Sequence, residues 1–171
     1  MTGKTGVIIG DESGVDAKYL DQSVKQKAES AASGDNVFRS VTDELVFDLK
    51  NGAFSLNTPK TQAITGYKSG YTAASAELSD IDVQIDNRYA TVVVNSLDGK
   101  PIAESGSMLL TTVGQVWNSG QVMRRDGTGF LKTGTYPVLC EPICGSVTIK
   151  TAGDFDVYIL DSSGRRGEKA S

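Results

Sequence analysis

The chain has 171 residues, 39% of them hydrophobic and 22% charged, which is ordinary for one globular domain with a substantial core. Its net charge is −4, and the lysines and arginines are dispersed instead of forming a basic stripe, which argues against a nucleic-acid partner. The sequence contains no run of about 18 apolar residues that would span a membrane, and its opening residues lack the apolar core of a signal peptide.

The first predicted element is a helix near residues 16–32. Apolar residues recur there at spacings of one, three and four: Tyr19, Leu20, Val24, Ala28 and Ala31. This spacing is typical of one helical face, and Ser13 or Asp16 can cap the start of the helix. Because the apolar stripe is narrow and rich in alanine, we expect residues 1–36 to be a lead-in segment. Its helix would lie across the following domain or connect it to a neighbour.

A β-hairpin is predicted on either side of Asn51-Gly52, a pair that favours tight turns. Large apolar residues alternate with other residues on both sides of this pair, as in half-buried strands. A two-residue loop would pair Leu49 with Phe54 and Phe47 with Leu56, so that these four side chains share one face of the hairpin.

An acidic strand is predicted between residues 80 and 86. Its apolar residues fall on one side, and Asp82 and Asp86 fall on the other. With Asp80, these carboxylates could bind Ca²⁺, but their spacing is not that of an EF-hand, and an alternating acidic face is usually the solvated side of a strand. We therefore predict no cofactor, with Ca²⁺ as the alternative.

The stretch from residue 90 to residue 119 is the richest in β-branched residues. It contains two dense runs, residues 91–94 and 109–116, separated by the turn pair Asp98-Gly99. The other segments are interpreted as further strands that pack against these two.

Residues 37–161 are predicted to form one all-β domain. Short strands with turns between them continue to residues 145–150 and 155–160, and a polar tail follows at residues 162–171. This pattern predicts a two-layer antiparallel β-sandwich with a jelly-roll-like topology, preceded by the one N-terminal helix.

The two cysteines are Cys140 and Cys144. In an extended strand they would lie about 13 Å apart, which is too far for a disulfide unless the chain folds back at Pro142. We expect two half-buried thiols, and a bridge is the alternative. With no histidine in the chain, no zinc site of ordinary composition is predicted.

Catalysis by this chain itself is not predicted. The absence of histidine removes the commonest general base and the usual serine and cysteine triads. Pairs of carboxylates such as Asp43 and Glu44 remain, but no feature of the sequence singles out one pair as a glycosidase-type acid and base.

Four motifs follow one another from near Leu45 to Arg166. They read GAFSLNTPKTQAITG, then TVVVNSLDGKPIAES with MLLTTVGQVWNSG, then YPVLCEPICGSVTIK, and finally VYILDSSGRRG. In this order they resemble the β-sandwich accessory domain found C-terminal to the catalytic barrel of glycoside hydrolases. The resemblance implies secretion as part of a larger enzyme, with the catalytic acids in a barrel outside this chain.

Two functional hypotheses follow. The first is a carbohydrate-binding module that holds a β-linked plant-type polysaccharide on exposed aromatic rings. The second is a structural accessory domain that packs on the catalytic domain of the same parent chain and binds no sugar. Either is expected to be a monomer without a nucleic-acid or membrane partner. The predicted sugar-binding residues lie beside glycine, proline or polar turn residues: Trp117, Asn118, Tyr67, Tyr71 and Tyr136.

Overall fold

The structure is a computed structural model that describes residues 36–68, 77–151 and 153–170. Within these residues the chain forms antiparallel strands and one short 3-10 helix, η2 (Ile102–Glu104), so the predicted all-β class is confirmed. The predicted helix near residues 16–32 and the candidate residue Tyr71 lie outside the described residues.

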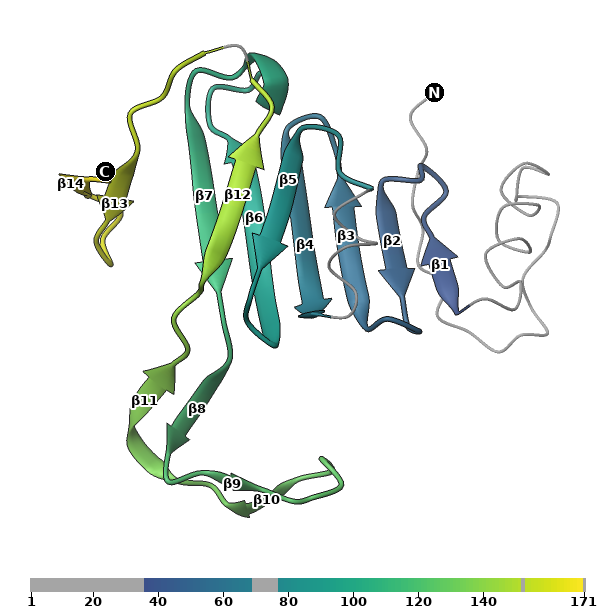
Figure 1. The fold of residues 1–171 in the computed structure, drawn as a ribbon, viewed down its shortest axis with the longest axis vertical. Helices are drawn as coiled ribbons and strands as arrows, with labels where there is room; N and C mark the ends of the chain where they lie inside the picture. Colours follow the sequence, from purple (N-terminus) through teal and green to yellow (C-terminus); the bar gives the residue numbers. More distant parts are fainter. Residues whose placement is uncertain (1–35, 69–76, 152, 171) are drawn as a thin grey trace, which may run out of the picture.

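The body of the fold is a six-stranded sheet in the order β1-β2-β3-β4-β6-β7 (Figure 1). Its strands are β1 (Val37–Arg39), β2 (Leu45–Asp48), β3 (Ala53–Asn57), β4 (Thr61–Tyr67), β6 (Tyr89–Ser96) and β7 (Met108–Val113). Every neighbouring pair is antiparallel. The β-branched run at residues 91–94 lies in β6, between β4 and the edge strand β7.

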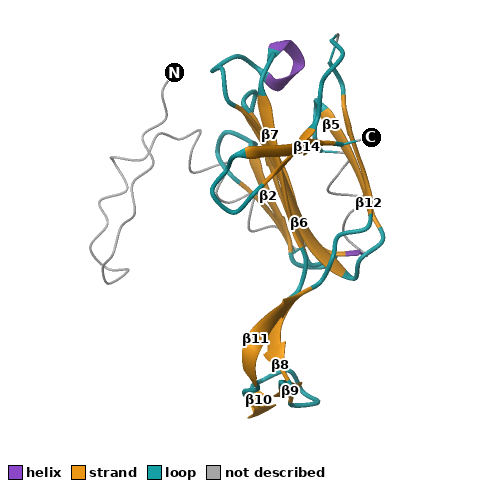
Figure 2. Cartoon of the chain, turned by 90° about the vertical axis from the view of Figure 1, so that its left-hand side faces the viewer, coloured by secondary structure: helices purple, strands orange, loops and turns teal. Residues whose placement is uncertain are grey.

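A second sheet covers part of one face of the first (Figure 2). It consists of β5 (Ile81–Ile85) and β12 (Gly145–Ile149), which pair antiparallel with Val83 opposite Val147. Because this second layer has only two strands among the described residues, the structure is not a clear two-layer sandwich, contrary to the expectation from the sequence.

The hydrophobic core lies between these two sheets. It consists of Ala53, Ile64, Leu78, Ile81, Val83, Ile85, Ala90, Val92, Val94 and Ile102. In β5 the apolar residues are buried and the residues between them are exposed, as the alternation of the acidic strand predicted. The large sheet therefore buries the face that β5 and β12 cover.

The register of the β2–β3 hairpin differs from the predicted register. Phe47 lies opposite Phe54, and the pair nearest the turn is Asp48 with Ala53, so four residues form the loop instead of two. The side chain of Asp48 accounts for the shift, because it accepts hydrogen bonds from the Asn51 backbone N–H at 2.9 Å and from the Asn51 amide at 2.6 Å. These bonds stabilise a loop of four residues, two more than the sequence predicted.

Of the four residues predicted to share one face, Phe47, Phe54 and Leu56 do so, on the face away from the core, whereas Leu49 lies in the loop. Phe47 is 47% exposed and contacts the ring of Phe54, with the centroids 6.3 Å apart. Smaller side chains, Val46, Ala53 and Ser55, are buried on the opposite face. The core-facing side of the hairpin is therefore the side with the smaller residues.

A long ribbon, which we call the arm (residues 115–141), leaves the body beyond β7 (Figure 1). It contains β8 (Val116–Ser119) paired with β11 (Thr135–Cys140), and β9 (Val122–Met123) paired with β10 (Phe130–Lys132). The run at residues 109–116 is thus divided between the body and the arm. Where the arm begins, a Cβ atom on Gly114 would come within 2.6 Å of the Glu141 carbonyl oxygen. The close approach of these two segments of the backbone therefore requires glycine.

The chain ends in a hairpin of β13 (Tyr158–Leu160) and β14 (Arg166–Lys169). Asp161 forms its turn, because its carboxylate accepts hydrogen bonds from the N–H groups of Ser163 and Arg165 at 2.8 and 2.9 Å. Part of the predicted polar tail at residues 162–171 is therefore a paired strand, although its sequence contains no apolar alternation.

Candidate functional site

Three of the predicted sugar-binding residues lie in the arm. Trp117 is in β8, opposite Leu139, and Tyr136 is near the start of β11. Trp117 is 36% exposed and Tyr136 is 88% exposed. The amide nitrogen of Asn118 donates to the Thr133 carbonyl at 3.0 Å, so this side chain ties β8 to the turn between β10 and β11. The sequence placed Trp117 at the end of a strand, next to Asn118, Ser119 and Gly120; it lies in β8, which ends at Ser119.

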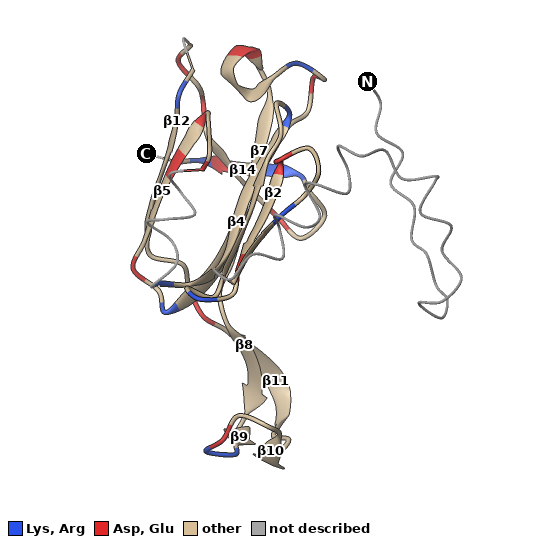
Figure 3. Ribbon diagram, turned by 90° about the vertical axis from the view of Figure 1, so that its right-hand side faces the viewer, with Lys and Arg blue, Asp and Glu red and all other residues tan. Residues whose placement is uncertain are grey.

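The arm exposes more apolar surface than these two rings. Its other exposed large apolar residues are Val116, Val122, Met123, Phe130, Leu131, Val138 and Leu139. Charged residues gather in the turn between β9 and β10, where Arg124, Arg125 and Asp126 follow one another (Figure 3). An apolar surface of this kind on a slender extension is typical of a binding surface.

Tyr67 belongs to a different element. It ends β4 and packs edge-on against Tyr89 of β6, with the ring centroids 5.4 Å apart. Tyr89 is held in turn by a 3.2 Å hydrogen bond between its hydroxyl group and that of Thr65. The structure therefore places Trp117, Asn118 and Tyr136 together in the arm and Tyr67 in the six-stranded sheet.

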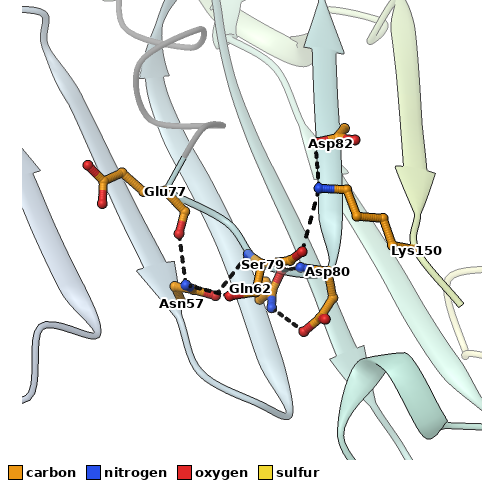
Figure 4. Close-up of polar contacts among 7 residues, drawn as sticks. All are labelled: Asn57, Gln62, Glu77, Ser79, Asp80, Asp82 and Lys150. Carbon is orange, nitrogen blue, oxygen red and sulfur yellow. Dashed lines mark hydrogen bonds and ion pairs between the residues drawn. The ribbon is translucent and has the colours of Figure 1, made fainter.

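The carboxylates of the acidic strand have partners within the protein. Asp80 accepts a 2.6 Å hydrogen bond from the amide of Gln62, whose own oxygen accepts the Asp80 N–H at 3.0 Å. Asp82 pairs with Lys150 at 3.0 Å, and the more exposed Asp86 lies 3.8 Å from Lys68. Figure 4 shows the contact between Gln62 and Asp80, and the ion pair of Asp82 with Lys150 on the exposed side of β5.

This polar network continues along the edge of the core. Asn57 donates to the Glu77 carbonyl at 2.8 Å and to the Ser79 hydroxyl at 3.0 Å (Figure 4). The Glu77 carboxylate accepts two hydrogen bonds from Arg39, which lower the pKa of Glu77 and raise that of Arg39. The network ties the segment that leads into β5 to the large sheet. Among the described residues there is no cluster of three or more metal-ligating side chains.

A hollow of about 740 Å³ lies at the end of the body that carries η2. None of the predicted site residues lines it. Its walls come from the β6–β7 loop and from the segment that contains β13 and β14: Lys100, Glu104, Asp154, Phe155, Asp156, Tyr158 and Arg166 are among the residues that line it. The clustering of Asp154, Phe155 and Asp156 in the sequence is the signal that could have indicated a polar site with a ring.

Asp98 organises one wall of this hollow. Its carboxylate accepts hydrogen bonds from the Gly106 N–H at 2.9 Å, from the Ser105 and Ser96 hydroxyls at 2.9 Å each, and from the Lys100 N–H at 3.2 Å. These bonds, the one from Gly106 most strongly, hold the pKa of Asp98 well below its ordinary value. The β6–β7 loop is therefore fixed by the four hydrogen bonds that the single carboxylate of Asp98 accepts.

Both cysteines are free and exposed, although half-buried thiols were expected. Cys140 ends β11, and Cys144 lies beyond Pro142, immediately before β12. The carbonyl of Pro142 accepts a 2.8 Å hydrogen bond from Asn87, and the Cys144 N–H donates to the same side chain at 2.8 Å. Asn87 thus fixes the return of the chain from the arm to the body.

Comparison with protein-family models, curated proteins and solved structures finds no match to this chain. In the part of the chain that the structure describes, no helix has the length and hydropathy that crossing a bilayer requires.

Proposed function

We propose that this chain is a non-catalytic carbohydrate-binding module of a polysaccharide-degrading enzyme, and that it binds a β-linked plant-type polysaccharide. The observation that carries the proposal is the exposure of Tyr136 and Trp117, 88% and 36%, on one two-stranded ribbon. Exposed aromatic rings stack on the apolar faces of sugar units, and few rings supply most of the energy of such a site.

The proposal includes the features implied by the resemblance. The catalytic residues belong to another domain of the parent chain, the parent enzyme is secreted, and the module is a monomer that binds neither nucleic acid nor a membrane. In a jelly-roll-like sandwich the second sheet would contain further strands in addition to β5 and β12, which are its two strands among the described residues.

An affinity-gel panel tests the proposal. The chain is run through native gels that contain cellulose derivatives, xylan, β-mannan or mixed-linkage glucan, and retention is compared with that in a gel without polysaccharide. We expect Trp117→Ala to weaken binding by roughly 2 kcal/mol, about thirtyfold, with an unchanged melting temperature. Tyr136→Ala should act in the same direction.

Leu139→Ala is the matched control, because Leu139 lies opposite Trp117 and is exposed but has no ring. It should retain wild-type binding if stacking is the mechanism. A Trp117→Ala protein that melts at a much lower temperature would show that the ring is structural. One that is stable and binds like wild type would overturn the proposed site.

The second candidate function is a structural accessory domain that packs on a glycoside hydrolase catalytic domain without binding sugar. The exposed aliphatic side chains of the arm favour it, because sugars stack on rings and would leave Leu131, Val138 and Leu139 in water. Under this alternative no gel in the panel retains the wild-type chain.

A further inference from the structure

The hollow beside η2 has two walls, which a hydrogen bond within the protein connects. Figures 1 and 2 show η2 and the chain that leads into β13 at the same end of the body. The hydroxyl of Thr151 in the second wall donates to the Ala103 carbonyl in the first at 3.3 Å, and Asp98 fixes the first wall internally. A site whose walls are already ordered loses little entropy when a ligand binds.

Two aromatic rings line this hollow. Phe155 is 39% exposed, and Tyr158 is half-buried, with the Arg166 guanidinium 5.1 Å from its ring centroid. The guanidinium holds the tyrosine ring in place by a cation–π contact. The hollow therefore offers ring surface beside polar groups, which is the combination that saccharides require.

Charges of both signs line the same space. Lys100 and Arg166 are positive, whereas Glu104, Asp154 and Asp156 are negative, and Asp156 pairs with Lys169. A small anion would be repelled by the carboxylates and a small cation by the two basic groups. This arrangement favours a neutral ligand whose hydroxyl groups can both donate and accept hydrogen bonds.

Several of these polar groups are available to a ligand. Within the described residues, the side chains of Lys100, Glu104 and Asp154 make no hydrogen bond or ion pair. A carboxylate can accept from two neighbouring hydroxyls, and an ammonium group can donate to a third. The volume of about 740 Å³ lies within the range of roughly 300–1,000 Å³ that is usual for small-molecule sites.

We propose that this hollow is a second saccharide-binding site, in which Phe155 contacts the apolar face of a neutral sugar unit while Asp154, Glu104 and Lys100 bind its hydroxyls. The inference rests on the proposed function and extends it, because the arm and the hollow could engage two places on one polysaccharide. Two linked sites raise the overall affinity for a long chain more than for a short oligosaccharide.

Titration with soluble oligosaccharides tests the hollow separately from the arm. Cellohexaose, xylohexaose and mannohexaose are titrated into the isotopically labelled chain, and backbone amide shifts are followed by NMR. We expect shifts at residues 100–106 and 153–158, and we expect Phe155→Ala and Asp154→Ala to weaken hexaose binding about tenfold or more. Ile159→Ala, an exposed apolar residue of β13, is the matched control and should bind like wild type.

The outcomes separate this inference from the proposed function. Retention on a gel that is lost in Trp117→Ala but unchanged in Phe155→Ala, Asp154→Ala and Lys100→Ala overturns the hollow and leaves the proposed function standing. If hexaoses shift only the amide signals of residues that line the hollow, the result supports the hollow as a saccharide site and contradicts the arm as the binding surface. The absence of both retention and shifts overturns the proposed function and the hollow with it. If Phe155→Ala lowers the melting temperature, the binding of Asp154→Ala and Lys100→Ala decides whether the hollow binds the saccharide.

Discussion

The carboxylate of Asp98 and the backbone N–H of Gly106 lie 2.9 Å apart and close the loop between β6 and β7. The same carboxylate accepts the hydroxyl of Ser105, which is buried although Asp98 itself is exposed. One turn residue thus positions the loop that carries η2 and forms a wall of the hollow.

We predict that this carboxylate makes the stability of the protein sensitive to acid. Its pKa is lower in the folded chain than its ordinary value of about 3.9. Its contribution is therefore complete above that value and is lost as the pH falls through the lower pKa of the folded state. Asp98→Asn should melt at a lower temperature than wild type at neutral pH, and the difference should shrink as the pH is lowered below about 4.

Thermal melts followed by circular dichroism across this pH range measure the effect. Asp86→Asn is a suitable control, because among the described residues the Asp86 carboxylate has only a 3.8 Å contact with Lys68 at the surface, which should contribute little. An Asp98→Asn protein with the melting temperature of wild type at neutral pH would show that the loop does not depend on the charge.

The pair of Gln62 and Asp80 gives a second prediction. Gln62 is fully buried and exchanges two hydrogen bonds with Asp80. Gln62→Leu should destabilise the fold by about 1–3 kcal/mol, because the Asp80 carboxylate and N–H lose their partners. Lys150→Ala, which removes an exposed ion pair with Asp82, should cost less than about 1 kcal/mol. Urea unfolding of both variants gives the comparison, and equal losses would contradict it.

A third prediction concerns the two faces of the large sheet. Ile64 is fully buried on the face under β5, and Ile64→Ala should cost about 2–5 kcal/mol. Phe47 lies on the opposite face, and Phe47→Ala should cost about 1 kcal/mol, chiefly through its contact with Phe54. If chemical denaturation shows equal losses, both faces of the sheet are covered in solution.

A fourth prediction concerns calcium. A bound Ca²⁺ at Asp82 would have to displace the Lys150 ammonium, 3.0 Å away, and one at Asp80 would have to displace the Gln62 amide. We therefore expect neither added Ca²⁺ nor EDTA to change the melting temperature, measured by differential scanning fluorimetry. A rise with Ca²⁺ that EDTA reverses would reveal a site, since a ligand that binds only the folded state stabilises it.

Local patterns in the sequence were sufficient for the fold class and for part of the strand arrangement. The alternation of Ile81, Val83 and Ile85 with polar residues identified which side of β5 is buried, because side chains of a strand point alternately to its two faces. The same rule placed Phe47 and Phe54 on one face of a hairpin. These features depend only on residues that are close together in the chain.

Distant contacts decided the rest. The pattern of the β2–β3 hairpin does not say which face is covered. Ala53 packs in the core with the apolar residues of β5, and Phe47, on the other face, is exposed. The side chain of Asp48 set a register that residue spacing alone did not predict.

The candidate sites divide in the same way. The sequence by itself determined that Trp117, Asn118 and Tyr136 adjoin turn residues and that no histidine is available for catalysis. Only the tertiary structure decided that these three residues lie in an arm away from Tyr67, and that Glu104 and Phe155 line one hollow. The physical reason is that burial and site geometry depend on which segments fold back on each other, and a linear pattern does not specify those long-range pairings.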